Sequence, residues 1–147
     1  MTDPTMASLR HDHAEVRRLI ARLRLIDSEL NSAEVDVRLV RRALDDVLAD
    51  MVRHVFRSMR DEEIVAYPPL ERALGSDVPV LALLAEHRVA RESVRALRAL
   101  MTAGGQEAVD RRLPAEVKSL ADELERHLRR EEAAFGALVH TAGTVSG

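Results

Sequence analysis

Residues 51–70 read MVRHVFRSMRDEEIVAYPPL, and this stretch decides how the chain is expected to fold. Upstream of it, apolar residues recur in steps of three and four, which is the period of the buried stripe of a bundled helix. These residues are Val40, Leu44, Val47 and Met51. At the same period the stripe continues through His54, Ser58, Asp61 or Glu62, and Val65. This helix is therefore predicted to bury ionisable side chains, which costs several kcal/mol unless they are paired or bind a metal.

The composition excludes several classes of site. The chain has no cysteine, which rules out disulfides, iron–sulfur clusters and cysteine zinc sites. Its formal net charge of −3 argues against a nucleic-acid partner. There is no apolar run long enough to span a membrane and no apolar signal-peptide core at the N-terminus. We therefore expect a cytoplasmic protein with no membrane partner.

Outside this stretch, helical periodicity predicts one all-α domain over residues 1–147, with a core at about 6–139 and a flexible C-terminal tail. Four helices are expected, at about 6–30, from the first turn to about 74, at 78–101, and from Pro114 to about 139. A short helical piece is expected at 106–112. The turns contain polar residues or glycine, and they are short. Short connections favour an antiparallel up-down-up-down four-helix bundle.

Each predicted helix carries ionisable residues on its apolar stripe. They are His13 on the first, His54 and Glu62 on the second, His87 on the third, and His127 and Glu131 on the fourth. Counting outward from the turns places Glu62 level with His87, and His87 level with His127. One buried histidine is most simply a structural residue, but several histidines and glutamates in one layer of an aliphatic core indicate a metal site.

The residue types in this layer favour a pair of metal ions. Carboxylates one helical turn from a histidine can bridge two ions in a helix bundle. The Glu-x-x-His spacing of ferritin-type sites and the His-Glu-x-x-His spacing of zinc proteases are both absent. Imidazole and carboxylate ligands accept iron, manganese and zinc alike, so the ligands alone leave the metal open.

Four segments resemble the hemerythrin family in its bacterial HHE cation-binding form. They are Asp12-His13, Glu62–Pro68 (EEIVAYP), Glu86-His87 and His127–Glu132 (HLRREE). The resemblance extends over roughly residues 6–139. It implies a non-haem di-iron site in a four-helix bundle, in a family whose members bind oxygen, sense oxygen or iron, or handle peroxide or nitric oxide.

The resemblance places five residues of this chain at ligand positions: His13, Glu62, His87, His127 and Glu131. It implies that Glu62 and Glu131 bridge two non-haem irons. With fewer histidines than the oxygen carriers, one iron is the alternative.

Two positions depart from the family pattern. Ser58 stands where a histidine is expected four residues before Glu62, and Arg91 stands where the oxygen carriers have a second histidine after His87. His54 is one turn earlier than Ser58, about 6 Å along the axis, and is a sixth candidate ligand if the helix shifts or bulges. The alternatives are water, Glu63 or Tyr67 as the replacement, an empty metal position, or a purely structural His54. Tyr67 is predicted mainly as a packing residue, and Arg91 as solvated or ion-paired.

A site with few histidines leaves metal positions open, which favours turnover with peroxide or simple metal binding over reversible oxygen carriage. The expected function is that of a non-haem di-iron protein interacting with oxygen, peroxide or nitric oxide, with an enzymatic activity on oxygen or peroxide left open. The alternative is an iron- or oxygen-responsive regulatory or storage module without turnover. A structural bundle with a degenerate site is the third reading.

Overall fold

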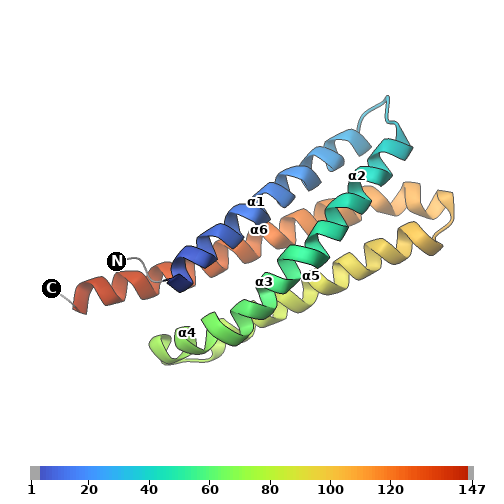
Figure 1. The fold of residues 1–147 in the computed structure, drawn as a ribbon. Helices are drawn as coiled ribbons and strands as arrows, with labels where there is room; N and C mark the ends of the chain where they lie inside the picture. Colours follow the sequence, from blue (N-terminus) through green and yellow to red (C-terminus); the bar gives the residue numbers. More distant parts are fainter. Residues whose placement is uncertain (1–3, 146–147) are drawn as a thin grey trace.

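The computed structural model describes the backbone of residues 4–145 and the side chains of residues 7–138 (Figure 1). It contains α1 (Pro4–Leu30), a long second segment over 37–74, α5 (Val78–Ala103) and α6 (Gln106–Val145). No strand occurs in the described backbone, so the all-α prediction is confirmed. None of its helices combines the length and the hydropathy that crossing a membrane requires.

The second segment is built from five consecutive helical pieces. They are α2 (Val37–Asp50), the π-helical turn η1 (Met51–Val55), α3 (Phe56–Asp61), the π-helical turn η2 (Glu62–Ala66) and α4 (Tyr67–Leu74). The side chain of Asp36 accepts hydrogen bonds from the first backbone N–H groups of α2, as an N-cap does. Gly75 ends α4 with φ at 69°, a left-handed conformation that glycine adopts without a Cβ clash.

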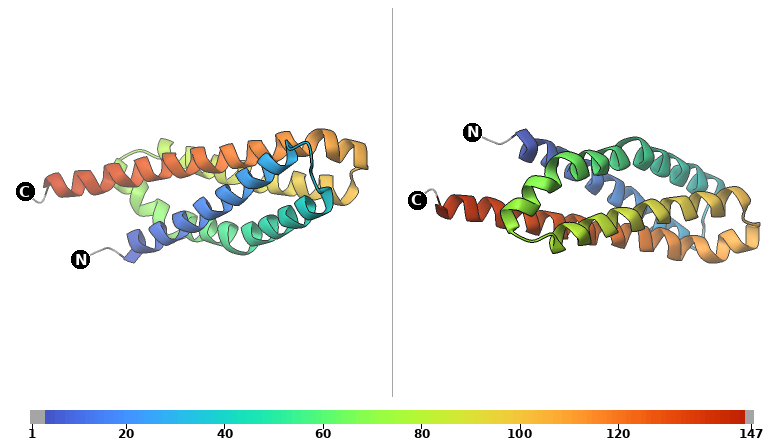
Figure 2. Two further views of the ribbon diagram at one scale, coloured as in Figure 1. Left: turned by 90° about the horizontal axis from the view of Figure 1, so that it is seen from above. Right: turned by 90° about the horizontal axis from the view of Figure 1, so that it is seen from below.

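The two π turns change which residues of this segment face the core. In η1 the N–H of Phe56 bonds to the carbonyl of Met51, and in η2 the N–H of Tyr67 bonds to that of Glu62. Each turn adds one residue relative to an α-helix. The second π turn precedes Pro68 and Pro69, whose rings need room beside the carbonyl four residues earlier. Figure 2 shows α4 set at an angle to α3.

The first π turn corrects the predicted stripe. The residues that the second segment buries between positions 51 and 62 are Met51, Val55, Met59 and Glu62. An uninterrupted α-helix would turn His54 inward, but the extra residue in η1 turns Val55 inward and leaves His54 exposed. Ser58, also expected on the stripe, is half-buried.

The buried apolar residues form two clusters, one toward each end of the bundle. Figure 1 shows the α1–α2 and α5–α6 connections at one end, and the α4–α5 connection with both termini at the other. The larger cluster fills the first end and includes Leu23, Leu44, Leu97 and Leu120. The smaller cluster lies toward the α4–α5 connection and includes Leu9, Tyr67, Leu70, Leu83 and Phe135. The gap between the clusters is where the polar residues lie.

The last helix is longer than predicted. The piece expected at 106–112 and the fourth helix are one element, because α6 runs through Pro114 without a break. The chain stays helical there although Pro114 removes one backbone N–H from the helix and its ring needs room beside the carbonyl of Asp110, four residues earlier. The helical backbone also continues past the end expected near residue 139, and residues 146–147 of the predicted tail lie outside the described part.

The register at η1 can be tested with two substitutions. Met59→Ala should lower the free energy of unfolding by about 2–5 kcal/mol, because it removes a side chain that is only 3% exposed. His54→Ala should change it by less than about 0.5 kcal/mol, because His54 is exposed. Urea unfolding of chelator-treated protein measures both, and the reverse ranking would show that the register is wrong.

Candidate metal centre

Five polar residues are buried between the two apolar clusters, and we call them the polar layer. They are His13, Glu62, His87, His127 and Glu131. They come from α1, η2, α5 and α6, so all four helical segments contribute. No other polar or charged residue is buried among the side chains that the structure describes. These five are also the residues that the resemblance placed at ligand positions.

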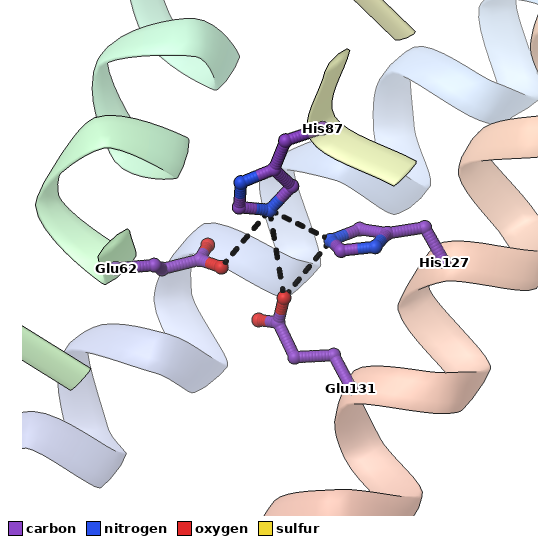
Figure 3. A group of neighbouring side chains, drawn as sticks. All are labelled: Glu62, His87, His127 and Glu131. Carbon is purple, nitrogen blue, oxygen red and sulfur yellow. Dashed lines mark hydrogen bonds and ion pairs between the residues drawn. The ribbon is translucent and has the colours of Figure 1, made fainter. Parts of the chain in front are cut away.

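The carboxylate of Glu131 lies at the centre of the layer. Its Oε1 is 2.8 Å from Nε2 of His13, and its Oε2 is 2.9 Å from Nε2 of His127. Nε2 of His87 lies 3.0 Å from Nε2 of His127. Figure 3 shows Glu62, His87, His127 and Glu131 converging from three parts of the chain. One ligand atom from each of these four lies within 4.8 Å of the others, which is close enough to bind one metal ion.

Tyr67, predicted mainly as a packing residue and otherwise as one possible replacement for the missing histidine, reaches this site. Its hydroxyl lies 2.7 Å from Oε2 of Glu131, 3.2 Å from Oε2 of Glu62 and 3.0 Å from Nε2 of His87. Its side chain packs in the smaller apolar cluster, as predicted, but its polar end reaches the layer. The π turn between them places Glu62 and Tyr67 one turn apart on the same face.

A carboxylate lies behind each histidine of the layer, and we call these three the outer carboxylates. The pairs are His87 Nδ1 with Glu63 at 2.8 Å, His127 Nδ1 with Glu86 at 3.0 Å, and His13 Nδ1 with Glu132 at 3.4 Å. A carboxylate at Nδ1 favours a hydrogen there, so Nε2 is the atom that a metal would bind once it displaces the hydrogen that Nε2 donates within the layer. All three Nε2 atoms face the layer and are thus the atoms available to a metal.

Each outer carboxylate is also bonded to an arginine. Arg91 bonds to Glu63 at 3.0 Å, Arg130 bonds to Glu86 at 3.3 Å, and Arg17 bonds to Glu132. The predicted ion pairing of Arg91 is confirmed, and its guanidinium is held by Glu63. A signal for the outer carboxylates was present in the sequence, since each is the direct neighbour of a layer residue.

The two carboxylates of the layer differ in protonation. Burial, together with the negative charge of Glu131, raises the pKa of Glu62 to about 10. Burial opposes ionisation of Glu131 as well, but hydrogen bonds from His127, His13 and His87 hold its pKa below the ordinary value. Metal-free protein at pH 7 therefore carries a neutral Glu62 beside an ionised Glu131, and a metal binding there has to displace the proton.

The structure does not bring His54 to the layer. A bulge was one way for His54 to reach a metal, but η1 turns it outward into a surface hollow that Asp50 also lines. The hydroxyl of Ser58 bonds to Asp12 beside Glu62, where the family pattern has a histidine.

One comparison with known protein families gives a match. The family model described as the Hemerythrin HHE cation binding domain matches residues 5–139. This range contains every residue of the polar layer and all three outer carboxylates. Neither the curated proteins nor the solved structures contain a match to the chain.

The pKa of Glu62 predicts how stability depends on pH. Unfolding returns it to its ordinary value near 4.5, so its contribution to stability is complete below that pH and is lost as pH rises toward 10. The loss is at most about 1.4 kcal/mol per pH unit. Glu62→Gln should remove this loss, because glutamine mimics the neutral acid.

Urea unfolding in the presence of a chelator, at pH 5, 7 and 9, measures this effect. The variant should gain stability over the wild type progressively as the pH rises. A constant difference between the two proteins at all three pH values would show that Glu62 is already ionised at pH 5.

Proposed function

The chain belongs to the hemerythrin HHE cation-binding domain family, and from that premise we propose that its polar layer holds two non-haem irons that react with oxygen, peroxide or nitric oxide. Membership confirms the resemblance drawn from four sequence motifs. The observation that carries the proposal is that three imidazole Nε2 atoms and two carboxylates face one another inside an otherwise apolar core. The proposal includes the up-down-up-down antiparallel order of the helices and a cytoplasmic location.

The donor set fits iron. Imidazole nitrogen and carboxylate oxygen are ligands that iron accepts, as manganese and zinc also do. The Nε2 atoms of His87 and His127 are 3.0 Å apart, a distance at which one of them carries a hydrogen. Metal would replace that hydrogen and the proton of Glu62, so uptake of the metal would release protons. Bound iron would supply the redox chemistry that oxygen and peroxide require.

The residues around the layer prepare it for this role. The outer carboxylates orient the imidazoles, and such partners typically change metal affinity by 10–100-fold, so about that much is expected here. The hydroxyl of Tyr67, 2.7 Å from Glu131, can donate a hydrogen bond beside the metals, and burial beside two carboxylates raises its pKa, which keeps the proton on its oxygen. The two apolar clusters exclude water from either side of the layer.

A surface hollow of about 330 Å³ provides an entry path to Glu62. It is lined by Asp12, Asp61 and Glu62 together with apolar side chains such as Leu9 and Val65. The carboxylates of Asp12 and Asp61 attract a cation, and the apolar wall admits a small neutral ligand. Metal and oxygen would thus reach the layer from the same side.

The second candidate function uses the same site without turnover, as an iron- or oxygen-responsive regulatory or storage module. The chains of hydrogen bonds that leave the layer favour it. They run from His87 through Glu63 to Arg91, and from His127 through Glu86 to Arg130, whose side chain is 51% exposed. A change at the metals would therefore reach the surface.

The ligand assignment predicts which variants lose iron. His127→Ala and Glu131→Ala should each lose most of the bound metal, because both remove a donor from the middle of the layer. Wild-type protein expressed with iron supplementation should hold about two irons per chain. Elemental analysis measures this content.

His54→Ala is the matched control for these variants and should keep the wild-type iron content, because His54 is exposed. Full iron content in both layer variants would contradict the assignment. Iron should also raise the thermal midpoint of the wild type, because a ligand that binds only the folded state stabilises it.

Peroxide distinguishes the two candidate functions. Iron-loaded protein should consume hydrogen peroxide faster than the same concentration of chelated iron, and the rate should fall in His127→Ala. An oxygen electrode, which records the oxygen released as the peroxide breaks down, measures the reaction. A change in thermal midpoint on iron binding, without peroxide consumption, would support the regulatory or storage module instead.

A further inference from the structure

A second site lies outside the polar layer, in a groove of about 530 Å³ between the η1–α3 stretch and α5. Figure 2 shows these two parts of the chain running beside each other. Five arginines line the groove: Arg57, Arg60, Arg91, Arg95 and Arg98. The proposed metal chemistry does not use this groove.

Among the residues that the structure describes, four of these arginines have no partner for their guanidinium groups. Arg91 is held by Glu63, but Arg57, Arg60, Arg95 and Arg98 make no ion pair or side-chain hydrogen bond within the described residues. By contrast, Arg24 is paired with Asp122 and Glu125, and Arg129 is paired with Glu125. The chain as a whole carries a formal net charge of −3. Four like charges around one groove repel each other, so an anion bound there would be stabilised by all four.

The apolar residues that line the groove indicate that its ligand has an apolar part in addition to its negative charge. Phe56 and Val94 lie among the arginines, and Phe56 is half-buried. Guanidinium groups bind phosphate through two parallel hydrogen bonds, and an aromatic ring offers a face on which a flat group can stack. The volume is in the range of small-molecule sites, about 300–1,000 Å³.

We propose that this groove binds a small organic anion that combines a polyphosphate chain with a flat ring, as nucleoside polyphosphates do. The phosphates lie against the four unpaired arginines, and the ring lies against Phe56. Arg91 forms part of the wall and stays on Glu63. The arginines surround one hollow of small-molecule size in an acidic chain, which favours this occupant over a nucleic acid or an acidic protein.

Calorimetric titration of the 147-residue chain with ATP, inorganic triphosphate and adenosine tests the proposal. ATP should bind, and each of its halves should bind at least about tenfold more weakly. Arg57→Gln/Arg95→Gln should weaken ATP binding about tenfold or more, because each charge-assisted hydrogen bond to phosphate contributes substantially. If this variant fails to fold, Arg60→Gln/Arg98→Gln tests the same groove.

Arg42→Gln/Arg111→Gln is the matched control. Both arginines are exposed, neither lines the groove, and the change in net charge is the same. Equal weakening by the groove and control variants would overturn the proposal in favour of non-specific attraction. If inorganic triphosphate binds as tightly as ATP, the proposed contact between the ring and Phe56 is wrong. If only an acidic peptide or an RNA binds, the ligand is not a small molecule and the proposal is wrong. The titration can be done with metal-free protein. A failure to bind ATP would therefore say nothing against the proposed iron site.

Discussion

The buried charge of Glu131 is the interaction on which the rest of the bundle depends. Its side chain is 1% exposed, and an unpaired carboxylate at that depth would cost several kcal/mol. The hydrogen bonds that satisfy it come from His13 on α1, Tyr67 on α4 and His127 on its own helix. Satisfying one charge therefore fixes three elements relative to one another, and Glu62 gives up its own charge as a result.

Charge alternates outward from this carboxylate. Around Glu131 lie imidazoles, behind them lie the outer carboxylates, and behind those lie arginines at the surface. His127, Glu86 and Arg130 form one such row, and burial alone would lower the pKa of His127, but the carboxylates on both sides raise it. The same arrangement that holds the metal-free core together also presents the nitrogen atoms that a metal needs.

Sequence periodicity located the layer wherever the helix is regular. His13, His87, His127 and Glu131 lie on uninterrupted α-helices, where the step of three and four holds. It failed at His54 because η1 contains one residue more than an α-helical turn, and a local repeat does not reveal that. The outer carboxylates could not be found this way, since each lies off its own helix's stripe and meets a histidine on another helix.

The position of the polar layer has a consequence for how the bundle opens. The layer divides the hydrophobic core into two unequal parts, and the smaller part, toward the α4–α5 connection, contains fewer buried apolar side chains than the larger one. Amides near α4 should therefore exchange with solvent through openings that leave the other end folded. A metal bound in the layer would couple the two parts into one cooperative unit. Metal binding should therefore slow amide exchange near α4.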